Sequence, residues 1–120
     1  RLLQRIEYYA DNQLALVVVP WEEIQKYSPF YNPAVLVLEE LRLAEGVKLS
    51  VVIKLYPDGK ITGKLRGNHG APYAGKLAEH FGGGGHDSAA GFKTHKWKFE
   101  QLKKELIDTA TDLIAKGAAK

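Results

Sequence analysis

The sequence predicts an α/β fold, in which a mixed β-sheet containing a hairpin is flanked by helices and packed against a long C-terminal helix. Three observations support this prediction. Residues 14–19 are rich in β-branched residues, and residues 47–56 alternate between apolar and polar, as strands do. Pro-Asp-Gly at 57–59 is a strong turn signal. Residues 96–115 place apolar side chains on one face of a helix.

Length and composition indicate one domain. The chain has 120 residues and a formal net charge of +3, and a chain of this length can bury its own core. No apolar run approaches the roughly 20 residues of a membrane-spanning helix, so we expect no membrane contact. Cysteine is absent, which excludes disulfides and thiolate metal sites and fits a cytoplasmic setting. Because the chain has no Met and begins at Arg1, we interpret it as a piece of a longer protein.

The N-terminal part of the chain is expected to alternate helices with a strand. The expected elements are a short entry helix or the end of an interdomain connector over 1–10, a buried strand over 14–19, a short helix over 21–27 and a helix over 34–44. Helical spacing of apolar residues predicts the first. Asn32 and Pro33 predict the start of the last, since a cap residue precedes a proline at the first helical position.

The clearest pair of elements is a β-hairpin. Residues 47–56 alternate between apolar and polar, apart from Val52, and residues 60–66 return after the turn at 57–59. Because successive side chains of a strand point to opposite faces, Lys64 and Arg66 point to the same side. Arg66 stands at the end of its strand.

The rest of the chain surrounds a run of four glycines, Gly82, Gly83, Gly84 and Gly85. The expected elements are a helix from Pro72 to about Phe81, the glycine run, one helical turn over 86–90, a strand over 92–95 and the long helix over 96–115.

The glycine run is the candidate anion-binding loop. Four consecutive glycines are costly to order, so we expect their backbone to meet something closely. Bare amides beside His86, followed by a helical turn, suit a phosphate group. The spacing matches neither the dinucleotide fingerprint nor the nucleotide-triphosphate loop. A flexible linker is the alternative, but Phe81 and Phe92 on either side indicate that the run is anchored at both ends.

Positive charge gathers around the run. Residues 60–98 hold seven Lys and Arg residues, only two acids, and all four histidines. A solvated basic face is one interpretation, and an anionic partner bound around the glycines is the other. Arg66 suits bidentate contact with phosphate, and Lys64 and Asn68 are further candidates beside it.

Neither a metal site nor a catalytic residue is predicted within the chain. The spacing of His69, His80, His86 and His95 does not match a ligand pattern, and no acid pairs with them in one. Ser88 lies near His86 but lacks a third partner for nucleophilic catalysis.

Residues 82–92, GGGGHDSAAGF, resemble the signature of the C-terminal associated domain of DHH-family phosphoesterases. That group includes RecJ-like exonucleases, the oligoribonuclease and phosphoadenosine-phosphate phosphatases, and cyclic-dinucleotide phosphodiesterases. The order of elements over 47–92 is also similar. One departure is Gly67, where the family commonly has a serine. Alanyl-tRNA synthetases carry a related domain, but their glycine motif usually lacks His86 and the Ala-Ala-Gly that follows.

The resemblance implies that the chain is the C-terminal, substrate-binding domain of a two-domain enzyme. A separate N-terminal domain, named for its Asp-His-His motif, would hold two divalent ions, usually manganese, that activate the attacking water. This chain has no such triplet, so we expect it to hold no cofactor and to be inactive alone. By position, the glycine amides and His86 would hold the phosphate near the metals, and Arg66 would contact a further phosphate or a base.

The expected substrate-binding residues are Lys64, Arg66, Asn68, Gly82, Gly83, Gly84, Gly85, His86, Ser88 and Ala89. The leading interpretation is the substrate-binding half of a manganese-dependent phosphoesterase that hydrolyses short oligonucleotides, nucleotide phosphates or cyclic dinucleotides. One alternative is a non-catalytic module for single-stranded nucleic acid, although the chain lacks the interleaved exposed aromatics of such modules. The other is the clamp domain of a polyphosphatase.

Overall fold

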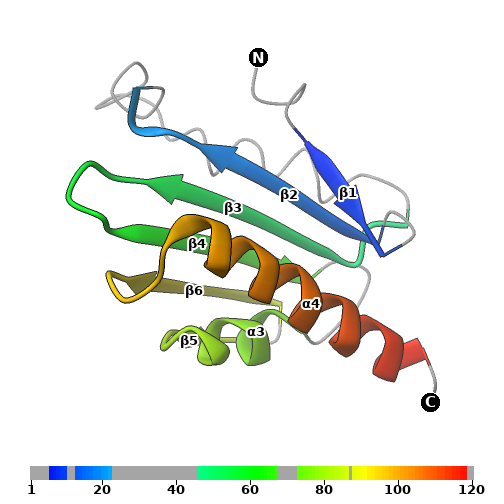
Figure 1. The fold of residues 1–120 in the computed structure, drawn as a ribbon. Helices are drawn as coiled ribbons and strands as arrows, with labels where there is room; N and C mark the ends of the chain where they lie inside the picture. Colours follow the sequence, from blue (N-terminus) through cyan, green and yellow to red (C-terminus); the bar gives the residue numbers. More distant parts are fainter. Residues whose placement is uncertain (1–5, 11–12, 23–45, 68–72, 87, 119–120) are drawn as a thin grey trace.

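The computed structural model of the chain describes residues 6–10, 13–22, 46–67, 73–86 and 88–118. They form a six-stranded mixed sheet in the order β1-β2-β3-β4-β6-β5, with helices α3 and α4 on one face (Figure 1). The elements are β1 (Glu7–Tyr9), β2 (Leu14–Val19), β3 (Leu49–Leu55), β4 (Ile61–Gly67), α3 (Ala74–His80), β5 (Gly84–Gly85), β6 (Ala89–Thr94) and α4 (Phe99–Ala118). The predicted α/β fold is confirmed.

One pair of strands, β2 and β3, runs parallel, with Leu14 opposite Leu49. Parallel neighbours need a crossover connection, and here it comprises the residues between Val19 and Leu49. The helices expected over 21–27 and 34–44 fall within it. Trp21 and Glu22 are helical, and the remainder of both helices, with the cap at Asn32, lies outside the described residues.

The helix expected over 1–10 is wrong in its second half. Glu7–Tyr9 is a strand that pairs antiparallel with β2, with Glu7 opposite Leu16. Ala10 adopts a φ of 55°, and the Gln13 amide donates to its carbonyl at 3.1 Å, which turns the chain back into β2. Pairing with an existing strand therefore overrides the helical spacing of the apolar residues, and residues 1–5 lie outside the described part.

A charged contact joins β1 to α4. One carboxylate oxygen of Glu7, Oε1, accepts a hydrogen bond from the Tyr9 hydroxyl at 2.7 Å and lies 3.0 Å from Lys103 Nζ. The hydrogen bond from Tyr9, followed by the one from Lys103, lowers the pKa of Glu7 below its ordinary value. The contact is partly exposed, so it adds modestly to stability.

The predicted hairpin is confirmed, and its alternation defines the core. β3 and β4 pair antiparallel from Leu49 opposite Gly67 to Leu55 opposite Ile61. Their core-facing residues pack with α3 and with the predicted apolar face of α4. The fully or nearly fully buried members are Leu49, Val51, Ile53, Ile61, Leu65, Leu77, Leu102, Leu106, Ala110 and Ile114.

The other face of the sheet is divided between apolar and polar side chains. Val17, Val19 and Val52 are buried although they point away from α3 and α4, which explains why Val52 breaks the alternation. Further along the sheet the same face carries Thr62, Lys64 and other polar residues of β4 and β6. The candidate site lies on the exposed, basic half of this face.

An aromatic cluster anchors the chain on both sides of the glycine run. The ring of Phe81 lies 5.0 Å from that of Phe92 and 5.3 Å from that of Trp97, centroid to centroid. Phe92 in turn covers Gly63, where a Cβ would stand 2.3 Å from the Phe92 ring. The predicted anchoring at both ends is thus confirmed, and the flexible linker does not describe this run.

Candidate functional site

The glycine run begins as the C-terminal cap of α3. Gly82 adopts a φ of +86°. Its amide donates to the Glu79 carbonyl at 3.0 Å, and the amide of Gly83 donates to the Ala78 carbonyl at 2.8 Å. A glycine with positive φ and two such bonds is a common helix ending. Two of the amides that we expected to meet an anion are therefore used within the chain.

The run continues as a short edge strand. Gly84 stands opposite Gly91 and Gly85 opposite Ala90 in an antiparallel pair. His86 and Ala89 exchange two backbone hydrogen bonds, of 2.8 and 3.2 Å. The helical turn expected over 86–90 is therefore wrong, since the chain turns tightly from β5 into β6. The reason is the pairing of His86 with Ala89, which continues the β5–β6 ladder to the turn.

Close packing explains why two of these positions are glycine. A Cβ at Gly83 would stand 2.1 Å from the carbonyl oxygen of Gly91, and one at Gly85 would stand 2.6 Å from the Cα of Ala90. Real Cβ atoms do not approach other atoms this closely, so a side chain at either position would push β5 away from β6. Gly84 has nothing within 4 Å of a Cβ.

α3 lies against β5 at Gly85. A Cβ at Gly75 of α3 would stand 3.2 Å from the Gly85 carbonyl oxygen and 3.3 Å from that of His86. The Gly85 backbone is therefore packed between α3 and Ala90 of β6.

The sheet brings Arg66 to the same end as His86. Arg66 stands opposite Ala89 in the β4–β6 ladder, and the Gly67 amide donates to the Ser88 carbonyl at 2.9 Å. Arg66 is half-buried, whereas His86 and Ser88 are exposed. We call Arg66, His86, Ser88 and Ala89 the sheet-end cluster. Since β6 separates β4 from β5, its two titratable members lie two strands apart, roughly 10 Å.

A groove of about 540 Å³ lies on the sheet face opposite α3 and α4. We call it the lysine groove; its lining residues are Lys54, Tyr56, Thr62, Gly63, Lys64, Gly82, Gly83, Gly91, Phe92 and Lys93. None of these described residues is acidic. Burial, followed by the positive charge of Lys64, lowers the pKa of Lys54 below its ordinary value. The groove is thus a concentrated positive region that includes two of the predicted glycines.

Lys54 and Lys93 were missed in the analysis of the sequence. The signal that identifies them is the alternation of β3 and β6 together with the strand register. Lys54 and Lys93 stand opposite Thr62 from either side, and Thr62 shares its face with Lys64.

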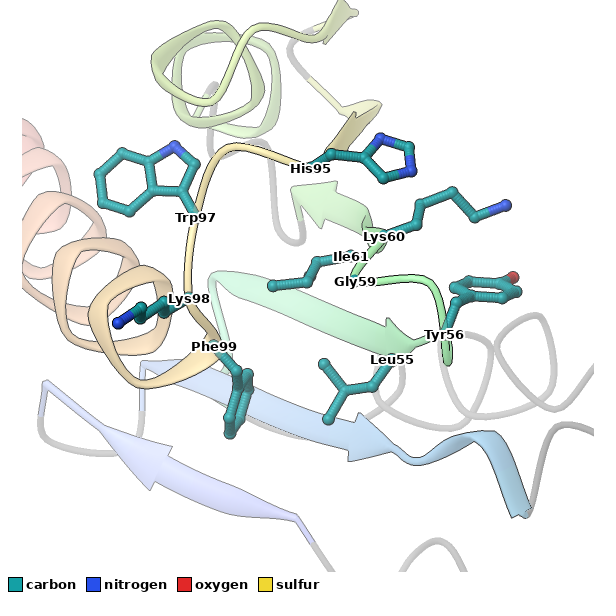
Figure 2. A pocket seen from close by; sticks show the side chains of 9 residues that line it. All are labelled: Leu55, Tyr56, Gly59, Lys60, Ile61, His95, Trp97, Lys98 and Phe99. Atoms are coloured by element: carbon teal, nitrogen blue, oxygen red, sulfur yellow. The ribbon is translucent and has the colours of Figure 1, made fainter.

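A second pocket, of about 420 Å³, lies at the turn between β3 and β4. In Figure 2 the side chains of Leu55 and Ile61 point into its middle, and Phe99 lies along one side. Lys60 and Lys98 extend outward on opposite sides of it. This pocket contains none of the predicted site residues.

The three histidines that the structure describes do not gather at one place. His80 pairs with Glu105 at 2.6 Å across α3 and α4, and His95 lies 3.4 Å from Asp58. In the part of the chain that the structure describes, no three His, Asp or Glu side chains come together to suit a metal ion. Asn68 and His69 lie outside that part.

The length and apolar character of the helices bear on the expectation of no membrane contact. None of the helices in the described ranges is long and apolar enough to cross a membrane.

The fold and the glycine motif together define a domain family. The chain belongs to the DHHA1 domain family, whose sequence model matches residues 33–116. This confirms the resemblance to the associated domain of DHH-family phosphoesterases.

Two solved structures share the fold. One is an exopolyphosphatase-related protein from Bacteroides fragilis, with a TM-score of 0.76 and 21% identity, matched over 95% of this chain and 34% of that one. The other is a pGpG-specific phosphodiesterase from Vibrio cholerae, with a TM-score of 0.64 and 17% identity, matched over 95% of this chain and 36% of that one. The chain thus spans about a third of the length of either. A comparison with curated proteins gave no match.

Proposed function

We propose that the chain is the substrate-binding half of a phosphoesterase that hydrolyses short oligonucleotides, nucleotide phosphates or cyclic dinucleotides. The observation that carries this proposal is the sheet-end cluster, in which the β4–β6 ladder holds Arg66 beside the turn that presents His86. Membership of the DHHA1 family supports it. So does the fold shared with a pGpG-specific phosphodiesterase. A cytoplasmic location fits such a substrate and is part of the proposal.

The sheet-end cluster offers two kinds of donor to one anion. The guanidinium of Arg66 has the fork geometry that matches two phosphate oxygens. The exposed imidazole of His86 can donate a further hydrogen bond. Because the Arg66 backbone is fixed by its neighbours in the sheet, less conformational freedom is lost on binding.

The chain's own residues are assigned binding and orientation of the substrate. The described residues do not fit a metal site. We propose that the two manganese ions belong to a separate N-terminal domain, where they would supply activated water. The chain alone is accordingly expected to bind a nucleotide without hydrolysing it.

A titration with linear pGpG, followed by amide NMR, tests this function. We expect the largest shifts at Arg66 and at Gly84 to His86, with weak affinity because half of the cleft is missing. Arg66→Gln removes the fork and should abolish those shifts, whereas Lys104→Gln on the exposed face of α4 should leave them intact. Shifts spread evenly over the surface, or none at millimolar ligand, would argue against the proposal.

A polyphosphatase clamp is the second candidate, favoured by the fold shared with an exopolyphosphatase-related protein. Competition decides between the two. If tripolyphosphate displaces pGpG from the sheet-end cluster at much lower concentration than pGpG displaces it, the clamp is the better assignment.

A further inference from the structure

The lysine groove extends the positive charge of the sheet-end cluster along the same face of the sheet. Arg66, Lys64 and Thr62 follow one another at two-residue steps on β4, and each step spans roughly 6.8 Å. Lys54 and Lys93 flank Thr62 on the neighbouring strands. Cationic side chains therefore occupy three successive rows that begin at Arg66.

Glycine keeps this path open. Gly91 stands opposite Lys64 in the ladder, so no side chain from β6 covers that row. Gly82 lines the outer side of the groove, and a Cβ there would meet nothing within 4 Å. Backbone atoms of these glycines thus provide uncharged surface beside Lys64. The Tyr56 ring lies beyond the Thr62 row, where Lys60 Nζ stands 4.1 Å from its centroid.

The charge of the groove calls for an anion with more than one charged group. Lys64 and Lys93 are exposed, and neither forms an ion pair with a described residue. Like charges that share a groove repel one another, and a polyanion laid across them relieves that repulsion.

We propose that the lysine groove binds the phosphates that follow the terminal phosphate of a single-stranded oligonucleotide, with Lys64 and Lys93 as the contacts. The inference rests on the proposed function, because it takes the terminal phosphate to lie at Arg66. Three rows accommodate about three consecutive phosphates at this spacing. The glycine backbone beside Lys64 leaves room for the sugars that separate successive phosphates of an oligonucleotide. Adjacent phosphates of an inorganic polyphosphate share one oxygen and stand closer together than these rows.

Calorimetry with 5′-phosphorylated oligonucleotides of increasing length tests the inference. Affinity for this chain should rise from one nucleotide to about three and then level off. Lys93→Gln should weaken trinucleotide binding about two- to fivefold, as expected for one exposed charge pair, and leave the mononucleotide unaffected. For Lys93→Gln, the slope of log affinity against log salt concentration should become smaller in magnitude by about 0.7, the value for one phosphate contact on a single strand. Lys104→Gln is the matched control, and Lys93→Arg should restore binding.

The outcomes separate this inference from the function on which it rests. If one and three nucleotides bind with equal affinity and Lys93→Gln has no effect, the proposal that the lysine groove binds phosphates is wrong. The proposed contact of Arg66 with the terminal phosphate is not affected by that result. If Arg66→Gln has no effect on mononucleotide binding, the proposed function fails and the inference fails with it. If tripolyphosphate binds as tightly as the trinucleotide and is equally sensitive to Lys93→Gln, the choice of an oligonucleotide is overturned.

Discussion

The four consecutive glycines provide a sharp test, because each faces a different constraint. Gly84 has open space around a Cβ and no positive φ. Gly84→Ala should therefore stabilise the chain by about 0.4–1 kcal/mol, by restricting the unfolded state. Gly82 also has open space but adopts a φ of +86°. Gly82→Ala should cost about 1–2 kcal/mol, the penalty for a left-handed L-residue.

The other two positions face backbone atoms. A Cβ at Gly83 would stand 2.1 Å from the Gly91 oxygen and 2.7 Å from the Phe92 Cα. These atoms cannot rotate aside, so Gly83→Ala should cost about 1–3 kcal/mol or more through displacement of β5 from β6. Gly85→Ala combines a contact of 2.6 Å with a φ of +144° and should be the most harmful of the four.

Urea unfolding followed by circular dichroism measures the four free energies on one scale. The expected order of stability is Gly84→Ala above wild type, then Gly82→Ala, Gly83→Ala and Gly85→Ala. The reasoning is refuted if Gly84→Ala loses as much stability as Gly83→Ala, or if Gly83→Ala unfolds within 0.5 kcal/mol of wild type, a margin typical of unconstrained positions. In that case the glycines would be present for a ligand and not for packing.

Three further predictions concern the core and the β1–α4 contact. Gly63→Ala should cost about 1–3 kcal/mol of unfolding free energy, since the new methyl meets the Phe92 ring at 2.3 Å. In a double-mutant cycle followed by urea unfolding, the double variant with Phe92→Leu should lose less stability than the sum of the two single variants. Leu106→Ala removes a fully buried side chain and should cost about 2–5 kcal/mol in urea unfolding. A loss below 1 kcal/mol, typical of surface positions, would contradict the place of Leu106 in the core. The pKa of Glu7 is lower in the folded chain than its ordinary 4.5, so its contribution is present above that pH and is lost as pH falls through the folded pKa. Glu7→Gln should therefore lower the unfolding free energy by a few tenths of a kcal/mol at pH 7 and by nothing at pH 2; equal losses at both would show that the charge is not the cause.

The periodic spacing of apolar residues was sufficient to predict the hairpin and the two helices. The hairpin, α3 and α4 each bury the side chains that their spacing indicates, because one face of each must meet the core. Periodicity failed at β1 and at the turn between β5 and β6. In both places a few residues suit either conformation, and hydrogen bonds to a partner strand decide between them.

Some residues of the candidate site could likewise be predicted from local sequence, whereas others could not. The glycine motif and Arg66 could be found from the sequence because the motif is a run of neighbours, and because alternation alone places Lys64 and Arg66 on one side. Asn68 remains a prediction, since it lies outside the described residues. Lys93 could not be found, because its place beside Thr62 depends on the register of two strands separated by α3 and the glycine run.

The sequence by itself determined the family of this protein and the local elements that carry its motif, since both are written in contiguous residues. Only the tertiary structure decided what the glycines do. Gly82 and Gly83 end α3, and Gly83 and Gly85 let β5 approach β6. Gly82 and Gly83 also line the lysine groove. Which amides are free and which cations are neighbours depends on non-local strand pairing, and a register between distant strands leaves no local pattern in the chain.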